Sequence, residues 1–489
     1  MSAELIAAIS NVANTKELLA QSVESTKDPS TRENSIICGA TITESQGTTE
    51  SLRNKRRTHT SNEGMYLLRL LRNLAIEKAF QEKMRDYNLL KGALRIMEAL
   101  NDRISDLRRD YEEEDRAMWW SQQATLTVRA TAQYICNFVT GNFNNQELLW
   151  NTVVSEPLST YLRCGIDRMT VGALCATVYN CIANSEERMT HLTREGHELL
   201  DVMLRTTAID KRVATDEAFD WVYFCVNKIL VTGNFVEAYK HLGDSDTTDS
   251  QVVLMKMVEA IVHKTKEDQT YPIDHPTCRF LVEKLNEISR KSLTESITKE
   301  EKGEDDSVDS VFNDEEFVSS NDLEMIFVLL QLFGTITVSN NDQTSPFSEL
   351  LFDCGIVDTI SDYKAEREHI AKGGKVSDSN RGGLSFGFKR DLVNILANLS
   401  FKNKKVQDRA RELDLFPVLL ASCRLDDKNP YIKEWSILSL RNLMEDNLQN
   451  QEAISQIKLQ GPAPSAELDE LGLKAEIENG KIKLTPVEM

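Results

Sequence analysis

The sequence has no run of about 18 apolar residues, the length that a helix needs to cross a bilayer. Its first residues, MSAELIAAISNVANTKELL, mix polar and apolar side chains at helical spacing. They lack the basic start and the continuous apolar block of a secretory signal. We therefore expect neither a membrane span nor a secretory leader.

Paired cysteines are missing as well. The nine cysteines are scattered, no CxxC pair occurs, and several lie in apolar runs such as TAQYICNFV and WVYFCVNKIL. An odd number of cysteines without regular spacing fits neither a disulfide framework nor a zinc site. We expect reduced, buried thiols, as in a cytoplasmic or nuclear protein.

Motifs of catalysis and cofactor binding are also absent. The sequence contains no GxSxG, no P-loop and no HExxH, and its seven histidines show no metal-ligand spacing. With only 21 dispersed glycines, a phosphate-cradling loop is not expected. The sequence thus predicts no catalytic residue, no metal site and no cofactor.

Positive charge is in short supply, because 57 lysines and arginines face 77 acidic residues and the net charge is −20. Such a surface repels phosphate backbones and anionic lipids, so nucleic acid and membrane are not expected partners. Basic segments of other proteins remain candidates.

Alternating strand patterns are nearly absent, and apolar residues recur instead at i, i+3, i+4 and i+7. This periodicity predicts helical repeats over residues 61–290, a further helical repeat over 323–370, and two strong helices at 388–400 and 431–444. The expected class is an all-α, armadillo- or HEAT-like helical solenoid, a superhelix of stacked α-α units.

The segments between the helical regions differ in composition. We expect residues 1–60 to be mostly disordered, 291–322 to be an acidic disordered insert and 371–387 to be a glycine-rich loop. The C-terminal tail, 461–489, contains AEIENGKIKL, which predicts a small hairpin around Asn-Gly.

A recurring asparagine aligns the helical segments. It appears in LLRLLRNLAI, TAQYICNFVT, CATVYNCIAN, YFCVNKILVT, VNILANLSFK and LSLRNLMEDN as Asn73, Asn137, Asn180, Asn227, Asn398 and Asn442. Three of the intervals between neighbours are 43, 47 and 44 residues, a period typical of helical repeat arrays. Gly334 in LLQLFGTITV stands in the place of the asparagine in one diverged copy.

A glutamine follows the asparagine in four copies. Gln81 follows by eight positions, and Gln146, Gln407 and Gln451 follow by nine. Because no helix pair of this length buries its apolar face alone, we expect the copies to stack and to form a concave surface.

Two roles are open for the asparagines. Their amides could pair with an extended segment of a partner, or they could satisfy backbone groups at a helix end. The tryptophan that import receptors place one turn before such an asparagine is absent, which argues against a groove for basic localisation signals. Asn137, Asn180, Asn227, Asn398, Asn442 and Trp435 are the predicted partner-binding residues.

Trp435 has a second interpretation, because Ile437, Leu438 and Leu440 around it favour a place in the core. The polar stretch Leu425-Asp426-Asp427-Lys428-Asn429-Pro430 predicts a turn. In that turn Asn429 or Asp427 would cap the helix that begins near Pro430.

The densest family signal lies in residues 386–454. Its motifs are Gly387-Phe388-Lys389, Leu396-Ala397-Asn398-Leu399, Lys402-Asn403-Lys404, Gln407-Asp408, Arg411-Glu412-Leu413-Asp414, Leu425-Asp426-Asp427, Asn429-Pro430-Tyr431, Glu434-Trp435, Arg441-Asn442-Leu443 and Asn450-Gln451. This stretch resembles the C-terminal domain of the ataxin-10 family, which we place at 388–460.

The resemblance implies an armadillo-type fold, a cytoplasmic location, no catalysis, and scaffold or regulatory roles linked to cytokinesis. We therefore expect a non-enzymatic scaffold that binds other proteins, and such a surface also allows a homo-oligomer. The alternative is an acidic transport or chaperone-like adaptor that binds basic client segments.

Overall fold

The computed structural model describes residues 65, 68–107, 114–153, 157–163, 167–208, 217–243, 246–265, 272–301, 320–338, 347–362, 387–457, 473–478 and 481–486. These residues fall into two compact units that divide within two helices. Unit 1 comprises the chain up to Phe280 together with Ser319–Val328, and unit 2 comprises Leu281–Val318 together with Leu329 onward.

Unit 1 is built of helices, beginning with a helical stretch at residues 68–74. Its further helices are α5 Lys78–Asp86, α6 Leu89–Leu107, α7 Glu114–Val139, α8 Phe143–Val153, α9 Pro157–Arg163, α10 Arg168–Ile182, α11 Glu186–Thr193, α12 His197–Ala208, α13 Glu217–Val231, α14 Phe235–His241 and α15 Asp249–Lys264. The first parts of α16 His275–Glu301 and α17 Ser320–Ile336 complete the unit.

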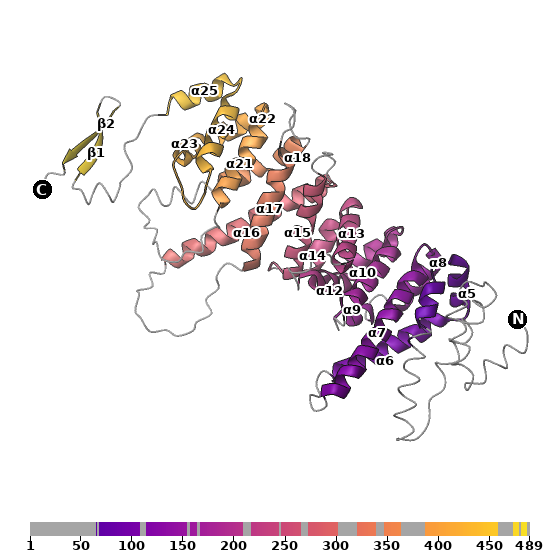
Figure 1. Ribbon diagram of the computed structural model, residues 1–489. Helices are drawn as coiled ribbons and strands as arrows, with labels where there is room; N and C mark the ends of the chain where they lie inside the picture. Colours follow the sequence, from indigo (N-terminus) through magenta and orange to yellow (C-terminus); the bar gives the residue numbers. More distant parts are fainter. Residues whose placement is uncertain are drawn as a thin grey trace, which may run out of the picture. The chain divides into compact units, whose positions relative to one another are not determined.

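The longer helices of unit 1 stack in chain order. α7 packs on α10, and α10 packs on α13, as the purple and magenta helices of Figure 1 show. Their buried faces carry residues such as Phe138, Leu174 and Val226, each at most 1% exposed. Burying a large apolar side chain contributes about 1.5–3 kcal/mol, so this shared face holds successive repeats together.

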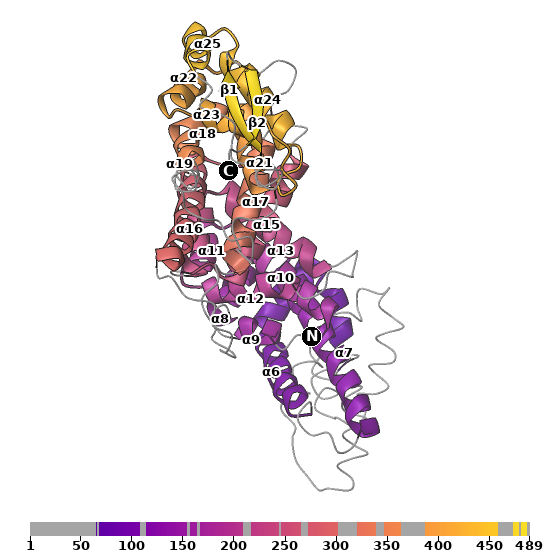
Figure 2. The same cartoon turned by 90° about the vertical axis from the view of Figure 1, so that its left-hand side faces the viewer.

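Unit 2 repeats the arrangement near the C-terminus. After the remainders of α16 and α17 come α18 Phe347–Asp353, α19 Ile356–Asp362, α21 Phe388–Ser400, α22 Lys404–Glu412, α23 Phe416–Ser422, α24 Ile432–Met444, α25 Leu448–Ser455, β1 Leu473–Glu478 and β2 Lys481–Pro486. α24 packs on α21, and α22 and α25 pack beside α24, in the orange and yellow part of Figure 2.

The ends of several helices share one backbone device. The second residue after α7, α13, α21 and α24 has a positive φ, at Gly141, Gly233, Lys402 and Asp446. A left-handed residue at this place ends a helix and turns the chain into the next one. The following residue, such as Asn142 or Asn403, then lies at the start of the next helix.

The all-α helical-repeat prediction is confirmed, including the helices at 388–400 and 431–444. The hairpin prediction is also confirmed, since β1 and β2 pair antiparallel with Glu478 opposite Lys481. The acidic insert expected over 291–322 is wrong at both ends, because residues 291–301 belong to α16 and residues 320–322 begin α17. Residues 302–319 of that insert lie outside the described residues. Residues 1–60 and 371–386 lie outside the described residues.

Within the described ranges, no helix combines the length and the apolar character that a bilayer span requires.

Candidate functional site

The recurring asparagines connect each repeat to the one before it. Asn137 Nδ2 donates to the carbonyl oxygen of Arg72 at 2.9 Å. Asn442 Nδ2 donates to the carbonyl oxygen of Ala397, also at 2.9 Å. In both cases the acceptor is the residue directly before the asparagine of the preceding copy, so one rule describes two distant junctions.

Two further asparagines each contact a threonine side chain just after the end of the long helix of the preceding repeat. Asn180 Nδ2 donates to Thr140 Oγ1 at 3.1 Å. Asn398 Nδ2 lies 3.4 Å from Thr337 Oγ1. Thr140 follows Asn137 by three residues and Thr337 follows Gly334 by three, so the structure places Gly334 where the diverged copy was expected.

The glutamines connect the repeats in the opposite direction. Gln81 is 2% exposed, and its Nε2 donates to the carbonyl oxygens of Ala75, Asn137 and Thr140 at 2.9, 2.8 and 3.1 Å. Ala75 lies just after the preceding helical stretch, whereas Asn137 and Thr140 lie at the end of α7. A single amide therefore satisfies carbonyl groups at two neighbouring helix ends that have no intrahelical partner.

Gln407 does the same in unit 2, where it is 3% exposed. Its Nε2 donates to Asn442 O at 2.9 Å, to Ser400 O at 3.3 Å and to Glu445 O at 3.4 Å. Gln146 and Gln451 each donate to one helix-end carbonyl of their own repeat, Val139 O and Met444 O.

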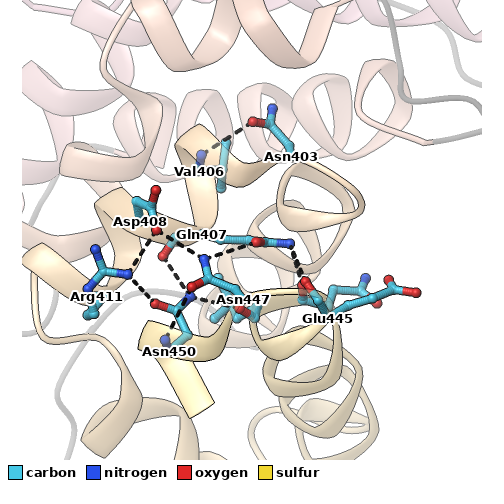
Figure 3. Close-up of polar contacts among 10 residues, drawn as sticks. Asn403, Val406, Gln407, Asp408, Arg411, Glu445, Asn447 and Asn450 are labelled. Atoms are coloured by element: carbon cyan, nitrogen blue, oxygen red, sulfur yellow. Dashed lines mark hydrogen bonds and ion pairs between the residues drawn. The ribbon is translucent and has the colours of Figure 1, made fainter. Parts of the chain in front are cut away.

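Two asparagines that the sequence interpretation missed complete each junction. Asn447 Nδ2 donates to Gln407 Oε1, and Asn450 Nδ2 donates to Gln407 O and to Leu443 O (Figure 3). Arg411 Nη1 donates to Asn450 Oδ1 at 2.6 Å. We call Gln407, Arg411, Asn442, Asn447 and Asn450 the C-terminal clamp.

The N-terminal clamp consists of Gln81, Arg85, Asn137, Asn142 and Asn145 in unit 1. Asn142 Nδ2 donates to Gln81 Oε1, Asn145 Nδ2 donates to Gln81 O and Phe138 O, and Arg85 Nη1 donates to Asn145 Oδ1. A sequence signal for both clamps exists in NFVTGNFNNQ and NLMEDNLQNQ, which share asparagines at positions one, six and nine and a glutamine at position ten.

Asn227 does not occupy the position of the recurring asparagines in its repeat. The segment TGNF occurs at 140–143 and again at 232–235, with the left-handed glycines Gly141 and Gly233 in the same place. In that register Ile229, and not Asn227, corresponds to Asn137. The half-buried Asn227 side chain makes no hydrogen bond to the residues that the structure describes.

Beside Asn227 lies a group of aromatic side chains that the sequence interpretation also missed. Tyr179 of α10 contacts Trp221 and Phe224 of α13, with ring centroids 5.5 and 5.9 Å apart. Tyr223 contacts Phe224 and Phe219 at 6.1 and 6.3 Å. We call Tyr179, Phe219, Trp221, Tyr223 and Phe224 the aromatic patch.

The aromatic patch is open to solvent, since Phe219 is 40% exposed and Phe224 is 42% exposed. Lys264 Nζ of α15 lies 5.8 Å from the ring centre of Tyr223. Phe224 and Asn227 are one helical turn apart on α13, so the free amide and the exposed ring share one face.

Trp435, the last predicted site residue, is half-buried on α24. The expected cap from Asn429 is wrong, because Asn429 Oδ1 accepts from the backbone N–H groups of Lys389 and Arg390 instead. Those donors belong to the start of α21, which has no side-chain cap of its own. Asn429 therefore caps a helix about 40 residues earlier in the chain.

Four thiols of unit 1 have raised pKa values, which favours their protonated form. Burial raises the pKa of Cys175 and of Cys181 to about 12, and it raises the pKa values of Cys136 and Cys225 as well. A thiol with a raised pKa is a weak nucleophile at neutral pH. Among the residues that the structure describes, no group of His, Cys, Asp and Glu side chains is placed to hold a metal ion.

Comparisons with known proteins agree with the resemblance at the C-terminus. Residues 388–485 match the family model described as the spinocerebellar ataxia type 10 protein domain, so the matched domain extends past residue 460 to include the hairpin. An engineered protein of known structure aligns over 88% of this chain and 98% of its own. The identity over that alignment is 11% and the TM-score is 0.30.

Curated relatives share the family name. The ataxin-10 homolog of Dictyostelium discoideum is 26% identical over 73% of this chain and 76% of its own length. Ataxin-10 of Bos taurus is 35% identical over 33% of this chain, and that of Homo sapiens is 34% identical over 32%. These two matches cover 29% and 28% of the mammalian proteins, less than a third of their length. The chain is therefore similar to ataxin-10 proteins, and its residues 388–485 match the domain that carries the family's name.

Proposed function

We propose that this chain is a non-catalytic scaffold that binds partner proteins through the aromatic patch and Asn227. The observation that carries the proposal is the exposure of Phe219 and Phe224, both at least 40%, next to an amide that has no partner among the described residues. Tyrosine and tryptophan are enriched at the centres of protein interfaces, where a few such residues supply most of the binding energy.

The other predicted asparagines are less available to a partner. Asn137 and Asn442 each use an amide N–H on a carbonyl of the preceding repeat, and Asn442 is 5% exposed. Partner binding at Asn137, Asn180, Asn398, Asn442 and Trp435 stays a prediction, which the same experiment addresses.

Affinity purification of the tagged full-length chain, with quantitative mass spectrometry, tests the proposal. Substituting Phe224→Ala or Asn227→Ala should reduce recovery of the same partners, by about tenfold or more for Phe224. Phe327→Ala is the matched control, because Phe327 is an aromatic residue with 43% exposure outside the patch. Partner recovery that survives both patch substitutions would contradict the proposal.

The adaptor for basic clients is the second candidate, and the net charge of −20 favours it. Long-range attraction between exposed charges is screened over about 8 Å at physiological salt. An acidic adaptor should therefore lose its partners steeply between 50 and 150 mM salt. Binding through the aromatic patch should change little over that range.

A cytoplasmic location and a role in cytokinesis are proposed from the similarity to the ataxin-10 family. Depletion of the protein should raise the fraction of cells with more than one nucleus, and the wild-type chain should restore the normal count. The Phe224→Ala chain should fail to restore it if partner binding at the patch serves cell division. A normal nuclear count after depletion would remove the link to cytokinesis and leave the scaffold proposal standing.

A further inference from the structure

A cavity of about 470 Å³ lies in unit 2, between α21, α23 and the loop from Cys423 to Tyr431. Its walls are mainly apolar and include Phe388, Leu392, Leu396, Leu419 and Ile432. A volume in this range suits one or two large apolar side chains or a small ligand.

The edge of the cavity carries three basic and two acidic side chains, a small positive excess in a chain that is strongly acidic overall. Lys389, Arg424 and Lys428 line it and are exposed, and none of them forms an ion pair with the residues that the structure describes. Asp426 and Asp427 line it too. The carboxylate oxygens of Asp426 are occupied, because Oδ1 accepts from Lys428 N and Oδ2 accepts from Asn429 Nδ2.

The loop at the edge is fixed before any ligand binds. Gly387 N donates to Lys428 O at 2.8 Å, and Asn429 Oδ1 holds the start of α21 at 3.0 Å from Lys389 N. Leu425, in the same loop, is 89% exposed, which leaves a large apolar side chain in water beside an apolar cavity. A preformed site loses less entropy when a ligand binds.

We propose that this cavity binds an acidic amphipathic peptide segment of a partner protein. The segment places one or two leucine or phenylalanine side chains in the cavity, and its carboxylates pair with Lys389, Arg424 and Lys428. All but one of the lining residues fall within 388–485, the stretch that matches the family domain. An acidic segment fits because its carboxylates complement the exposed basic side chains at the edge.

A fluorescein-labelled synthetic peptide, Asp-Glu-Leu-Asp-Glu-Leu-Phe-Glu-Glu-Asp, is the probe, and fluorescence anisotropy with the full-length chain is the measurement. Two matched peptides replace either all acidic residues by lysine or the three apolar residues by serine. The acidic apolar peptide should bind at least about tenfold more tightly than both controls, because charge and apolar burial both contribute.

Charge-reversal variants locate the binding. Lys389→Glu and Arg424→Glu should each weaken binding by about tenfold, whereas Lys404→Glu, an exposed lysine of α22 outside the cavity, should not. Leu425→Ser should also weaken binding, and the exposure of Leu425 makes loss of folding a poor explanation.

Several results would overturn the proposal. The acidic and lysine peptides could bind with equal affinity, or no peptide could bind. The charge reversals at Lys389 and Arg424 could also leave the affinity unchanged. The alternative occupant is the C-terminal tail of this chain, residues 458–489, and a chain that ends at Ile457 tests it. If the shortened chain binds the peptide and the full-length chain does not, the tail occupies the cavity and the proposal fails. The site is separate from the aromatic patch, so neither outcome decides the proposed function.

Discussion

The N-terminal and C-terminal clamps each consist of one glutamine, one arginine and three asparagines. The Gln–Arg spacing and the spacings among the asparagines are the same in both, although only the C-terminal clamp falls within the matched family domain. In each, a buried glutamine donates to carbonyls of two helices, and two asparagines close the junction. The last carbonyl groups of each long helix need hydrogen-bond donors. We infer that this need explains why the two clamps are alike.

The repeat between the clamps solves the same problem differently. Arg188 stands where Asn145 and Asn450 stand in the clamps, and its Nε donates to Cys181 O at 2.6 Å. Its Nη2 donates to Gln146 Oε1, and its guanidinium lies 4.8 Å from the ring centre of Phe143. The same position in each repeat, that of Asn145, Arg188 and Asn450, therefore supplies a donor to a helix-end carbonyl, although the residue type differs.

Removing the central glutamine should have the largest effect and should act alike in both clamps. Gln407→Ala and Gln81→Ala each leave up to three carbonyls without that donor, which should cost about 2–4 kcal/mol of unfolding free energy. Urea unfolding followed by hydrogen exchange reports each unit separately. Gln451→Ala is the control, since Gln451 makes one exposed bond and should cost less than about 1 kcal/mol.

The cap on α21 should come next in size. Asn429→Ala removes the acceptor for Lys389 N and Arg390 N, and losing an N-cap costs about 1–2 kcal/mol. Hydrogen exchange should rise at the start of α21 and leave the start of α24 unchanged. Faster exchange at α24 instead would show that Asn429 caps the nearer helix after all.

The left-handed residues next to the two clamps, Gly141 and Asp446, allow two substitutions with opposite expected effects on stability. Gly141 has φ +68° and open space around it, so Gly141→Ala should cost about 1 kcal/mol from backbone strain alone. Asp446 has φ +54°, so Asp446→Gly should be neutral or stabilise unit 2 by a few tenths of a kcal/mol. Thermal unfolding of the two variants measures both effects, and a shift of the same sign would show that the two turns are not equivalent.

A smaller difference between the clamps concerns pH. Burial tends to raise the pKa of Asp408, but hydrogen bonds from Asn447 and Arg411 outweigh it and hold the pKa below its usual value. The resulting stability is present above the unfolded pKa of about 4 and is lost as pH falls through the lower folded pKa.

The N-terminal clamp has Glu82 at the position of Asp408, and Glu82 forms no ion pair with the described residues. Asp408→Asn should therefore reduce the acid sensitivity of unit 2 and leave unit 1 unchanged, with less than about 1 kcal/mol lost at neutral pH. Urea midpoints between pH 5 and 2.5 measure this dependence. An unchanged midpoint curve for unit 2 would show that Asp408 contributes nothing.

Local patterns allowed much of the fold to be predicted from sequence. Helical periodicity gave α21 and α24, and the spacing of Asn398 to Gln407 and of Asn442 to Gln451 located two repeat junctions. Satisfying backbone groups at a helix end is one of the two roles that the sequence left open, and Asn137 and Asn442 do so. Which carbonyls accept could not be predicted, because those acceptors lie on another helix 35 to 65 residues away.

The register error at Asn227 has a different cause. An asparagine near a helix end was counted as a repeat position, although the TGNF segment places the junction two residues later. The aromatic patch and the cavity arise only when α10 meets α13 and when α21 meets α23. Such surfaces depend on tertiary packing, which periodicity along one helix does not contain.

The recurring asparagines join repeats, whereas Asn227 makes no hydrogen bond to the described residues and is free for a partner. The most direct test compares the unfolding free energies of Asn442→Ala and Asn227→Ala in the full-length chain. We expect a loss of about 1–2 kcal/mol for Asn442→Ala, because Ala397 O then loses the amide donor of the next repeat and keeps only the Ser400 hydroxyl. For Asn227→Ala we expect a change within about 0.5 kcal/mol. Equal losses, or a larger loss at Asn227, would contradict these roles.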